Sequence, residues 1–485
     1  MEQNFRESPQ QHFLIAIYPM QSHINPSRHL ARKIAHYTGA RVTVSTAVSG
    51  HRKLCSSLSS PDEEFHDSQL YYLPYSDGYD EGFKKDVHDL KDYMTRTRIV
   101  GSESLSALLD RLKQYGQPVT HIIYSILMTW VPDVAKAHGI PSMQFWIQPA
   151  TVLAIYYYFF RGYKDTIISV ANDPKAEIKF PCLPPLKIRD LPSFATMTNE
   201  DSPYYQVLGM LELTIEALEK ESVDGVKPKV LVNSFDELES DVIKSMEKKL
   251  DLISVGPMLA SDKEDKHEFN DLFQTDHKVY LEWLSTKPEK SVVYISFGTY
   301  SMMSKQQLEE ISRCLKEAGW PYLWIVRKDN RDIEGFDFEK LASATDGLVV
   351  EWCHQMDVLR HPSVGCFVTH CGWNSTLEAL ACGVPAVGVP QWTDQLTNAR
   401  LIEEWGIGVR GEIGENGVIE GKELKRCLEA VMGDGESVEK VREMSAFWKE
   451  RARVAVAEGG SSERNLRVFL EDIRRSKMKI DINCS

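Results

Sequence analysis

The 485-residue sequence lacks both a long apolar run and a run of basic residues. Its longest nearly apolar stretch, residues 149–160, is too short to span a bilayer. The formal net charge is −14 at pH 7, and Lys and Arg do not cluster, which argues against a nucleic acid or an anionic membrane as a partner. The polar first residues, MEQNFRESPQQ, lack the apolar segment of a signal peptide. We therefore expect a soluble cytoplasmic protein.

The sequence also lacks the cysteine patterns of disulfide frameworks and zinc sites. Its nine cysteines are scattered through a chain large enough to fold without disulfides, so we expect them to be reduced. The Cys and His residues between positions 353 and 371 form no Cys-x2-Cys or His-x3-His pair, and buried strand cysteines account for them better. We expect no metal and no other cofactor.

What the chain does contain is an alternation of short β-rich apolar runs with segments of helical periodicity, which is typical of parallel α/β sheets. One helix is expected to begin at Asn25 and Pro26, a cap residue followed by proline at the first helical position. Another is expected after Ser304, whose spacing to Gln307 predicts a capping box. The expected strands form two series, at 13–18, 41–46, 121–124, 142–145 and 230–233, and at 292–296, 322–326, 348–351, 365–369 and 385–389.

The two series predict two doubly wound α/β domains. We place them at residues 1–258 and 279–460, joined by a charged linker at 259–278 and followed by an amphipathic helical segment at 461–485. Two such domains would face each other across a cleft at the carboxyl ends of both sheets, which is where ligands bind in folds of this kind.

Residues 370–375, HCGWNS, end one expected strand and open a helix. The backbone N–H groups and the dipole at such a helix start suit a diphosphate, and His370, Asn374 and Ser375 would add side-chain donors. The alternative is that Asn374 and Ser375 merely cap the helix.

Six further positions suit the rest of a nucleotide sugar. Trp352 offers a flat face for a uracil ring and Gln355 a hydrogen bond for the nucleoside, although a core tryptophan is the simpler interpretation. Glu378 lies on the same helix face as Asn374 and would accept from a ribose diol, unless it is only a solvated charge. Asp394 and Gln395 would hold sugar hydroxyls, and upstream Thr299, after a glycine turn, would close the same site.

Residues 352–395 read WCHQMDVLRHPSVGCFVTHCGWNSTLEALACGVPAVGVPQWTDQ. From end to end this stretch resembles the donor-binding box of plant secondary-product UDP-glycosyltransferases, and the resemblance adds Cys353 and Trp373 to the donor-binding set. It implies a GT-B fold whose C-terminal helix packs back on the N-terminal domain. It also implies UDP-glucose as donor, since a terminal Gln such as Gln395 goes with glucose in the family, and a small hydrophobic acceptor. We expect a monomer.

The segment YPMQSHINP, residues 18–26, resembles the catalytic loop of the same family, and His23 matches its base. A neutral imidazole would take the proton of a phenol or an alcohol near pH 7. Many members carry an Asp that orients this histidine, but the matching position here is Ser125, and Asp133 is a doubtful substitute. Because a hydroxyl cannot stabilise an imidazolium as a carboxylate does, we expect a weaker base and an acidic acceptor, a carboxylate or an acidic phenol.

A subgroup of the family shares Ser or Thr at this position together with the phrase WIQPA, here residues 146–150. It acts on anthocyanidins, flavonoids, benzoate-like acids and an apocarotenoid diacid. In the resemblance, Trp146 matches a position beside the sugar and the acceptor.

No Asp-x-Asp triplet occurs, although metal-dependent sugar transferases use such carboxylates to hold a cation. We therefore expect the helix dipole, with His370, Thr299 and Ser375, to stabilise the leaving UDP in a single inverting displacement.

Three alternatives remain at this point. A glycoside hydrolase would need two carboxylates flanking one bond, and none is identifiable. A nicotinamide dehydrogenase would rest on the glycines of residues 406–411, which follow a helical segment instead of a strand. A non-catalytic UDP-sugar-binding protein is the third.

Overall fold

The computed structural model describes residues 11–55, 63–67, 69–84, 87–181, 183–202, 204–220, 227–260, 277–299, 301–331, 333, 335–414 and 416–483, without the side chains of 277–278 and 476–483. Residues 261–276, most of the expected linker, lie outside this set.

The N-terminal lobe is built on an eight-stranded sheet with strand order β10-β9-β6-β5-β1-β2-β4-β3. All its pairings are parallel except that of β3 with β4. Its strands are β1 (His12–Ile17), β2 (Arg41–Thr46), β3 (Phe65–His66), β4 (Tyr71–Tyr72), β5 (His121–Ser125), β6 (Ser142–Trp146), β9 (Lys229–Val232) and β10 (Asp251–Ser254), and a separate two-stranded sheet pairs β7 (Glu177–Ile178) with β8 (Leu186–Lys187). Its helices are α1 (Gln21–Thr38), α2 (Val48–Leu54), α3 (Leu90–Gln114), α4 (Val131–Ala137), α5 (Ala150–Tyr158), α6 (Lys164–Ser169), α7 (Tyr205–Lys220) and α8 (Ser240–Met246), with the short turns η1 (Phe159–Tyr163), η2 (Ile188–Asp190) and η3 (Ser193–Thr196).

The C-terminal lobe is built on a six-stranded parallel sheet with strand order β13-β12-β11-β14-β15-β16. Its strands are β11 (Val292–Ser296), β12 (Tyr322–Ile325), β13 (Gly347–Val350), β14 (Val364–Thr369), β15 (Ala386–Gly388) and β16 (Gly408–Arg410). Its helices are α9 (His277–Ser285), α10 (Lys305–Ala318), α11 (Lys328–Arg331), α12 (Phe338–Ser343), α13 (Gln355–Arg360), α14 (Trp373–Cys382), α15 (Gln395–Glu404), α16 (Gly421–Met432) and α17 (Glu436–Val456).

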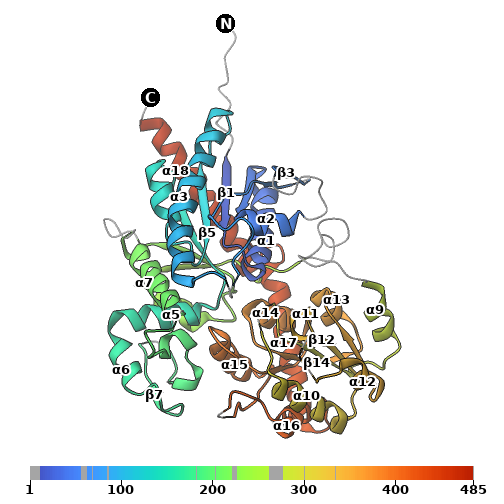
Figure 1. Ribbon diagram of the computed structural model, residues 1–485. Helices are drawn as coiled ribbons and strands as arrows, with labels where there is room; N and C mark the ends of the chain where they lie inside the picture. Colours follow the sequence, from blue (N-terminus) through green and yellow to red (C-terminus); the bar gives the residue numbers. More distant parts are fainter. Residues whose placement is uncertain are drawn as a thin grey trace.

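Continuous apolar strands form the centre of each lobe. Every residue of β1 and of β14 is buried, as expected for strands covered by helices on both faces. The large sheet of the N-terminal lobe lies at the top of Figure 1, and α6 and β7 of the same lobe extend downward beside the C-terminal lobe.

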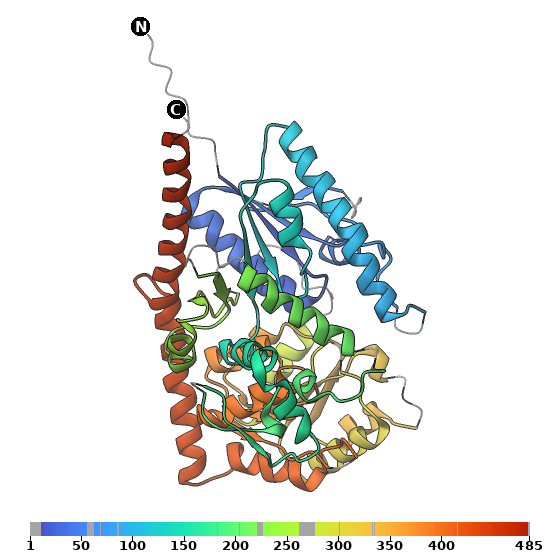
Figure 2. The ribbon, with the colours of Figure 1, turned by 90° about the vertical axis from the view of Figure 1, so that its left-hand side faces the viewer.

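The last helix, α18 (Ser461–Asn483), begins beside the C-terminal lobe and runs along the N-terminal one (Figure 2). Its Leu466, Phe469 and Leu470 belong to the apolar core of the N-terminal lobe. Ser462 donates to the Gly256 carbonyl, so polar contacts also hold this helix against the N-terminal lobe.

All ten expected strands are present with ends within one residue of their expected positions, whereas β10, β16 and the two-residue strands β3, β4, β7 and β8 were missed. The expected start of α1 was wrong, because the helix begins five residues before Pro26, at Gln21. Ser304 does cap α10 by accepting from the Gln307 N–H, but the Gln307 side chain bonds Ile419 instead of returning to the cap. Only one of the two hydrogen bonds of the expected capping box is therefore present, the one that Ser304 accepts.

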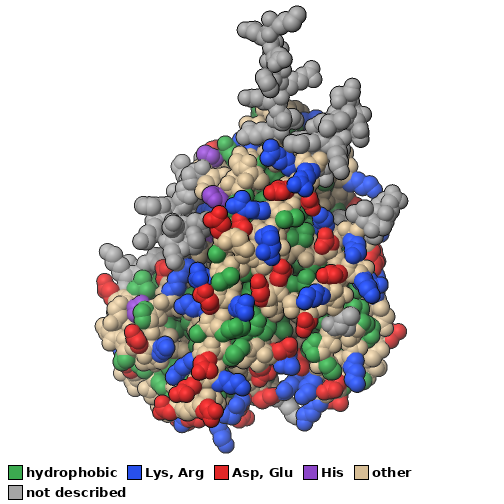
Figure 3. Space-filling model, turned by 180° about the vertical axis from the view of Figure 1, so that it is seen from behind, with side chains coloured by type: hydrophobic (Ala, Val, Ile, Leu, Met, Phe, Trp, Pro, Cys, Tyr) green, Lys and Arg blue, Asp and Glu red, His purple; other side chains and the backbone are tan. Residues whose placement is uncertain are grey.

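Among the described residues, no helix is both long and apolar enough to cross a membrane. On the face seen from behind, acidic and basic side chains alternate over the described surface (Figure 3).

Candidate active site

The segments that follow β1 and β14 meet between the lobes. Pro26 lacks a backbone N–H, so the carbonyl of Ser22, four residues earlier in α1, receives no helical hydrogen bond from it. Asn374, in the first turn of α14, donates its Nδ2 proton to this Ser22 oxygen over 2.9 Å. The proline thus leaves an acceptor on α1 that the C-terminal lobe uses, and this contact brings the predicted base and the predicted donor box together.

His23 lies in the first turn of α1, not in a loop as expected, and is 5% exposed. Its Nδ1 lies 3.2 Å from the Oγ of Ser125, at the end of β5. The Ser125 Oγ also accepts the N–H of Tyr18 over 3.0 Å and donates to the Met128 sulfur over 3.7 Å. Asp133 is exposed on α4, so the structure offers Ser125 as the partner of His23.

This set of partners fits the tautomer of His23 that carries its proton on Nδ1. A hydroxyl has one proton and two lone pairs. With the proton of Ser125 on Met128 and one lone pair on Tyr18, the other lone pair accepts from Nδ1–H of the histidine. The opposite nitrogen, Nε2, is then left without a proton, as a base requires. Burial lowers the pKa of His23 to about 3, which keeps the ring neutral.

The start of α14 is open to an anion. Gly372 is the N-cap residue, and no side chain caps the helix, so Asn374 and Ser375 are not the caps that the simpler interpretation required. His370 lies between Gly298 and Gly372, where an added Cβ would come within 2.7 Å and 2.5 Å of its ring. Its Nδ1 is buried without a hydrogen-bond partner in the described structure, and burial lowers the pKa of this ring to about 4. A neutral, unpaired imidazole beside a free helix start fits a phosphate.

A hydrogen-bonded group lies behind this helix start. The Gln355 Nε2 donates to the Ser375 Oγ over 2.9 Å and to the Glu378 carboxylate, and its Oε1 accepts from the Tyr294 hydroxyl. The same hydroxyl lies 3.3 Å from the Cys353 sulfur, which is buried. The predicted positions Gln355, Ser375 and Glu378 are therefore brought together, and Tyr294 is a member that sequence reasoning missed.

The remaining donor positions lie in loops around this group. Trp352 is half-buried between β13 and α13, and Thr299 is half-buried after Gly298. Asp394 and Gln395 are buried at the start of α15. The Asp394 carboxylate accepts from Thr393, from Asn398 and, across the lobes, from the Gln148 Nε2 over 3.1 Å.

The structure places two predicted site residues in apolar cores. Trp146 is fully buried because it ends β6, a central strand of the sheet. Its indole N–H donates to the Pro149 carbonyl. Trp373 is 4% exposed and donates to the Asn233 carbonyl of the N-terminal lobe while its ring packs near Trp405. Both side chains pack the protein instead of lining an open site.

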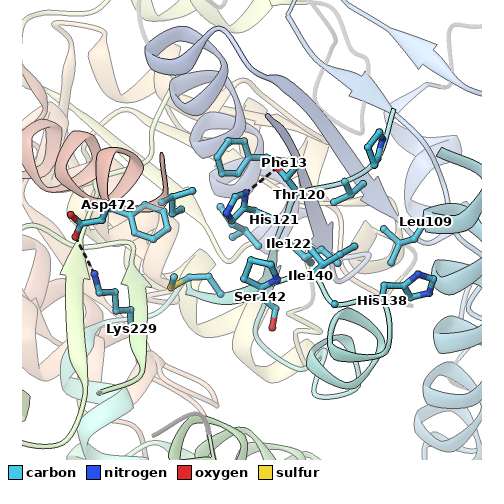
Figure 4. A pocket seen from close by; sticks show the side chains of 18 of the residues that line it. Phe13, Leu109, Thr120, His121, Ile122, His138, Ile140, Ser142, Lys229 and Asp472 are labelled. Atoms are coloured by element: carbon cyan, nitrogen blue, oxygen red, sulfur yellow. Dashed lines mark hydrogen bonds and ion pairs between the residues drawn. The ribbon is translucent and has the colours of Figure 1, made fainter. Parts of the chain in front are cut away.

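The described residues contain no group of three or more His, Cys, Asp and Glu side chains that could hold a metal. A cavity of about 610 Å³ occurs elsewhere, at the amino-terminal edge of the N-terminal sheet and beside α18 (Figure 4). Phe13, Ile122 and Phe469 line it, and the ion pair of Lys229 with Asp472 lies at one side. This cavity is far from His23 and Ser125. His23 follows the carboxyl end of β1, and Ser125 is the last residue of β5, whereas the cavity lies at the amino-terminal ends of these strands.

Signals for the missed residues are weak in the sequence. Gly298 and Gly372 stand beside predicted positions, but their role, which is room for the His370 ring, appears only in three dimensions. Gln148 stands in a phrase that sequence reasoning singled out for its tryptophan.

Comparison with known proteins identifies a family and relatives of matching length. Residues 274–454 match the model of the family UDP-glucoronosyl and UDP-glucosyl transferase. Phloretin 4'-O-glucosyltransferase of Malus domestica is 44% identical over 488 residues, covering 96% of this chain and 98% of that protein. Crocetin glucosyltransferase, chloroplastic, of Gardenia jasminoides is 43% identical over 474 residues, covering 96% and 97%. Os79 from O. sativa, solved in complex with UDP, has a TM-score of 0.81 at 29% identity and is matched over 100% of its chain and 96% of this one.

Proposed function

The chain belongs to the UDP-glucoronosyl and UDP-glucosyl transferase family, has the GT-B fold that its resemblance implied, and is an enzyme. From this premise we propose that it transfers glucose from UDP-glucose to a phenolic hydroxyl or a carboxylate of a small apolar plant metabolite, with inversion at the anomeric carbon and without a metal. The observation that carries the proposal is the position of a neutral base, His23, on a helix that contacts the donor box through Ser22 and Asn374.

We assign the donor to the C-terminal domain, 279–460, and the acceptor to the N-terminal domain, 1–258. The open start of α14 and the unpaired Nδ1 of His370 support binding of the diphosphate there, with Thr299 and Ser375 as further donors. Trp352, the backbone of Cys353, Gln355 and Glu378 would hold the nucleoside, while Asp394 and Gln395 would hold the sugar. Asn374 reaches the same region, although one of its amide protons is used by Ser22.

The reaction we propose is a single displacement. The acceptor oxygen attacks the anomeric carbon, its proton passes to Nε2 of His23, and the bond from that carbon to the UDP oxygen breaks. The electron pair of this bond leaves with UDP, whose new charge the helix start stabilises. An acceptor that is already ionised needs no base, and only the displacement remains.

Acidic acceptors suit this site best. An imidazole whose pKa is lowered to about 3 is a weak proton acceptor, and Ser125 carries no charge that would stabilise its protonated form. The relatives named for phloretin, a phenol, and crocetin, a dicarboxylic acid, agree with this class.

The test is an acceptor panel with UDP-glucose, analysed by mass spectrometry and NMR. Matched compounds, benzoic acid and benzyl alcohol among them, should give faster transfer to the acid, and the product should be β-linked. An α-linked product would refute the single displacement. Release of free glucose without an acceptor would instead favour a hydrolase.

We also propose a cytoplasmic monomer. Seven cysteines are described, at positions 55, 314, 353, 366, 371, 382 and 427, and they form no disulfide with one another, which suits a reducing compartment. One relative carries the word chloroplastic in its name, so imaging of a fluorescent fusion would separate the two compartments. Light scattering after gel filtration would give the mass.

A further inference from the structure

The loop that carries the predicted sugar carboxylate is held by the opposite lobe. Asp394 is 7% exposed, and its Oδ1 accepts from the Gln148 Nε2, which follows β6 in the N-terminal lobe. Its Oδ2 accepts from Asn398 within its own lobe. The carboxylate is therefore oriented from both lobes at once.

A second set of contacts holds the residue before it. The backbone N–H of Ser193 donates to the Thr393 carbonyl over 2.9 Å, and the Thr393 N–H donates to the Ser193 Oγ over 2.8 Å. Thr393 has a φ of 57°, a left-handed conformation that is uncommon for a residue other than glycine and that needs such support. The Trp392 ring meets Tyr204 edge-on. The position of Asp394 thus depends on the N-terminal lobe.

The orientation of the Gln148 amide follows from chemistry. The Asp394 carboxyl group already accepts from the Thr393 hydroxyl and the Asn398 amide, so the amide nitrogen of Gln148 faces it as a further donor and the amide oxygen points elsewhere. That oxygen is buried, and no described residue donates to it. Buried amide oxygens are nearly always paired, so this one lacks a donor that a ligand would supply.

A sugar hydroxyl supplies such a donor at this place. It can donate to the amide oxygen of Gln148 while a neighbouring hydroxyl donates to the carboxylate that Gln148 orients. This inference rests on the proposed function, in which Asp394 binds the transferred sugar. We propose that Gln148 determines specificity for the donor sugar: its N–H positions Asp394, and its carbonyl oxygen accepts a hydrogen bond from a hydroxyl of that sugar.

The experiment compares Gln148→Met with the wild-type enzyme. Methionine keeps the length of the side chain and removes both hydrogen bonds. We expect kcat/KM for UDP-glucose to fall about 10- to 100-fold, while the Kd of UDP, which has no sugar, stays within about twofold. UDP-galactose differs from UDP-glucose only in the configuration of one hydroxyl group of the sugar. The preference for UDP-glucose over UDP-galactose should fall about tenfold.

Two further variants serve as controls. Gln391→Met makes the same change at an exposed position of the neighbouring loop and should leave every parameter unchanged. Ser193→Ala weakens the hold on Thr393 without touching a sugar, so it should lower kcat/KM for both UDP-sugars by the same factor.

The inference is overturned if Gln148→Met keeps the wild-type kcat/KM and sugar preference. It is equally overturned if the variant loses UDP and UDP-glucose affinity in parallel, since that is the mark of a purely structural residue. If the wild-type enzyme uses another UDP-sugar, the glucose part of the proposed function is wrong, and the same comparison with that sugar and its epimer still decides the role of Gln148.

Discussion

The two halves of the site are organised in different ways. In the C-terminal lobe, Gln355 donates to both Ser375 and Glu378 within one short stretch of chain, and the start of α14 adds backbone donors. In the N-terminal lobe, one buried histidine is oriented by a hydroxyl 102 residues away. In the proposed function, donor affinity is therefore shared among neighbouring residues, whereas proton transfer depends on a single side chain. Changes at His23 should therefore leave the Kd of UDP, which carries no sugar, intact.

The largest effect should come from the catalytic half. Replacing His23 by Ala removes the proposed base, and we expect kcat/KM for a phenol to fall by about 10² to 10⁴. The Kd of UDP, measured by calorimetry, should not change, because the donor residues lie in the other lobe. A parallel loss of UDP binding would show that the two halves are not separate.

A smaller effect should follow from the donor half. Glu378→Ala removes the proposed ribose acceptor and a partner of Gln355. Losing a hydrogen bond to a charged group costs about 1.5–3 kcal/mol, so the Kd of UDP should rise about 10- to 100-fold. Glu317→Ala, an exposed carboxylate on α10, is the matched control. An unchanged Kd in Glu378→Ala would remove this residue from the donor site.

The same difference explains what sequence reasoning could predict. The donor half lies in one continuous stretch, so its resemblance to the family's donor box could identify Gln355, His370, Ser375 and Glu378 together. The parallel strands were predictable because strands such as β1 and β14 are apolar throughout and bounded by polar turns. Short edge strands such as β16, with three residues, carry too little pattern.

The rest depends on contacts between distant segments. The helix start before Pro26 was missed because the carbonyl that proline leaves unpaired is satisfied by Asn374, from the other lobe. The core positions of Trp146 and Trp373 follow from which face of a strand or helix is covered, which local pattern does not specify. Gln148 had no signal, since its partner Asp394 lies 246 residues away.

A variant that should gain activity tests the role of the residue beside His23. Ser125→Asp places a carboxylate beside His23 Nδ1, where the Tyr18 N–H can also donate to it. By stabilising the protonated ring it should raise the rate with benzyl alcohol relative to benzoic acid by about tenfold. Ser125→Ala, which removes the orienting oxygen, should shift the ratio the other way. Equal ratios in all three enzymes would mean that this position does not act through the base.

The smallest expected effect concerns the dependence of stability on pH, which follows from buried histidines. Burial lowers the pKa of His12 to about 4 and those of His23 and His29 to about 3 in the N-terminal lobe, and that of His370 to about 4 in the other. Because each folded pKa lies below the unfolded value of 6.5, the unfolded chain binds these protons first. Stability is then full above pH 6.5 and is lost as the pH falls toward 4.

Each histidine should therefore lower the free energy of unfolding by about 1 kcal/mol between pH 6.5 and pH 5.5. His29 is the one to replace, because it has no role in the proposed reaction and its neighbours Arg28, Arg32 and Lys33 also lower its pKa. In urea unfolding at both pH values, His29→Gln should reduce the drop by about 1 kcal/mol and leave transfer rates unchanged. A drop identical to that of the wild-type enzyme would mean that His29 titrates normally in the folded protein, and that burial in this lobe does not set its acid sensitivity.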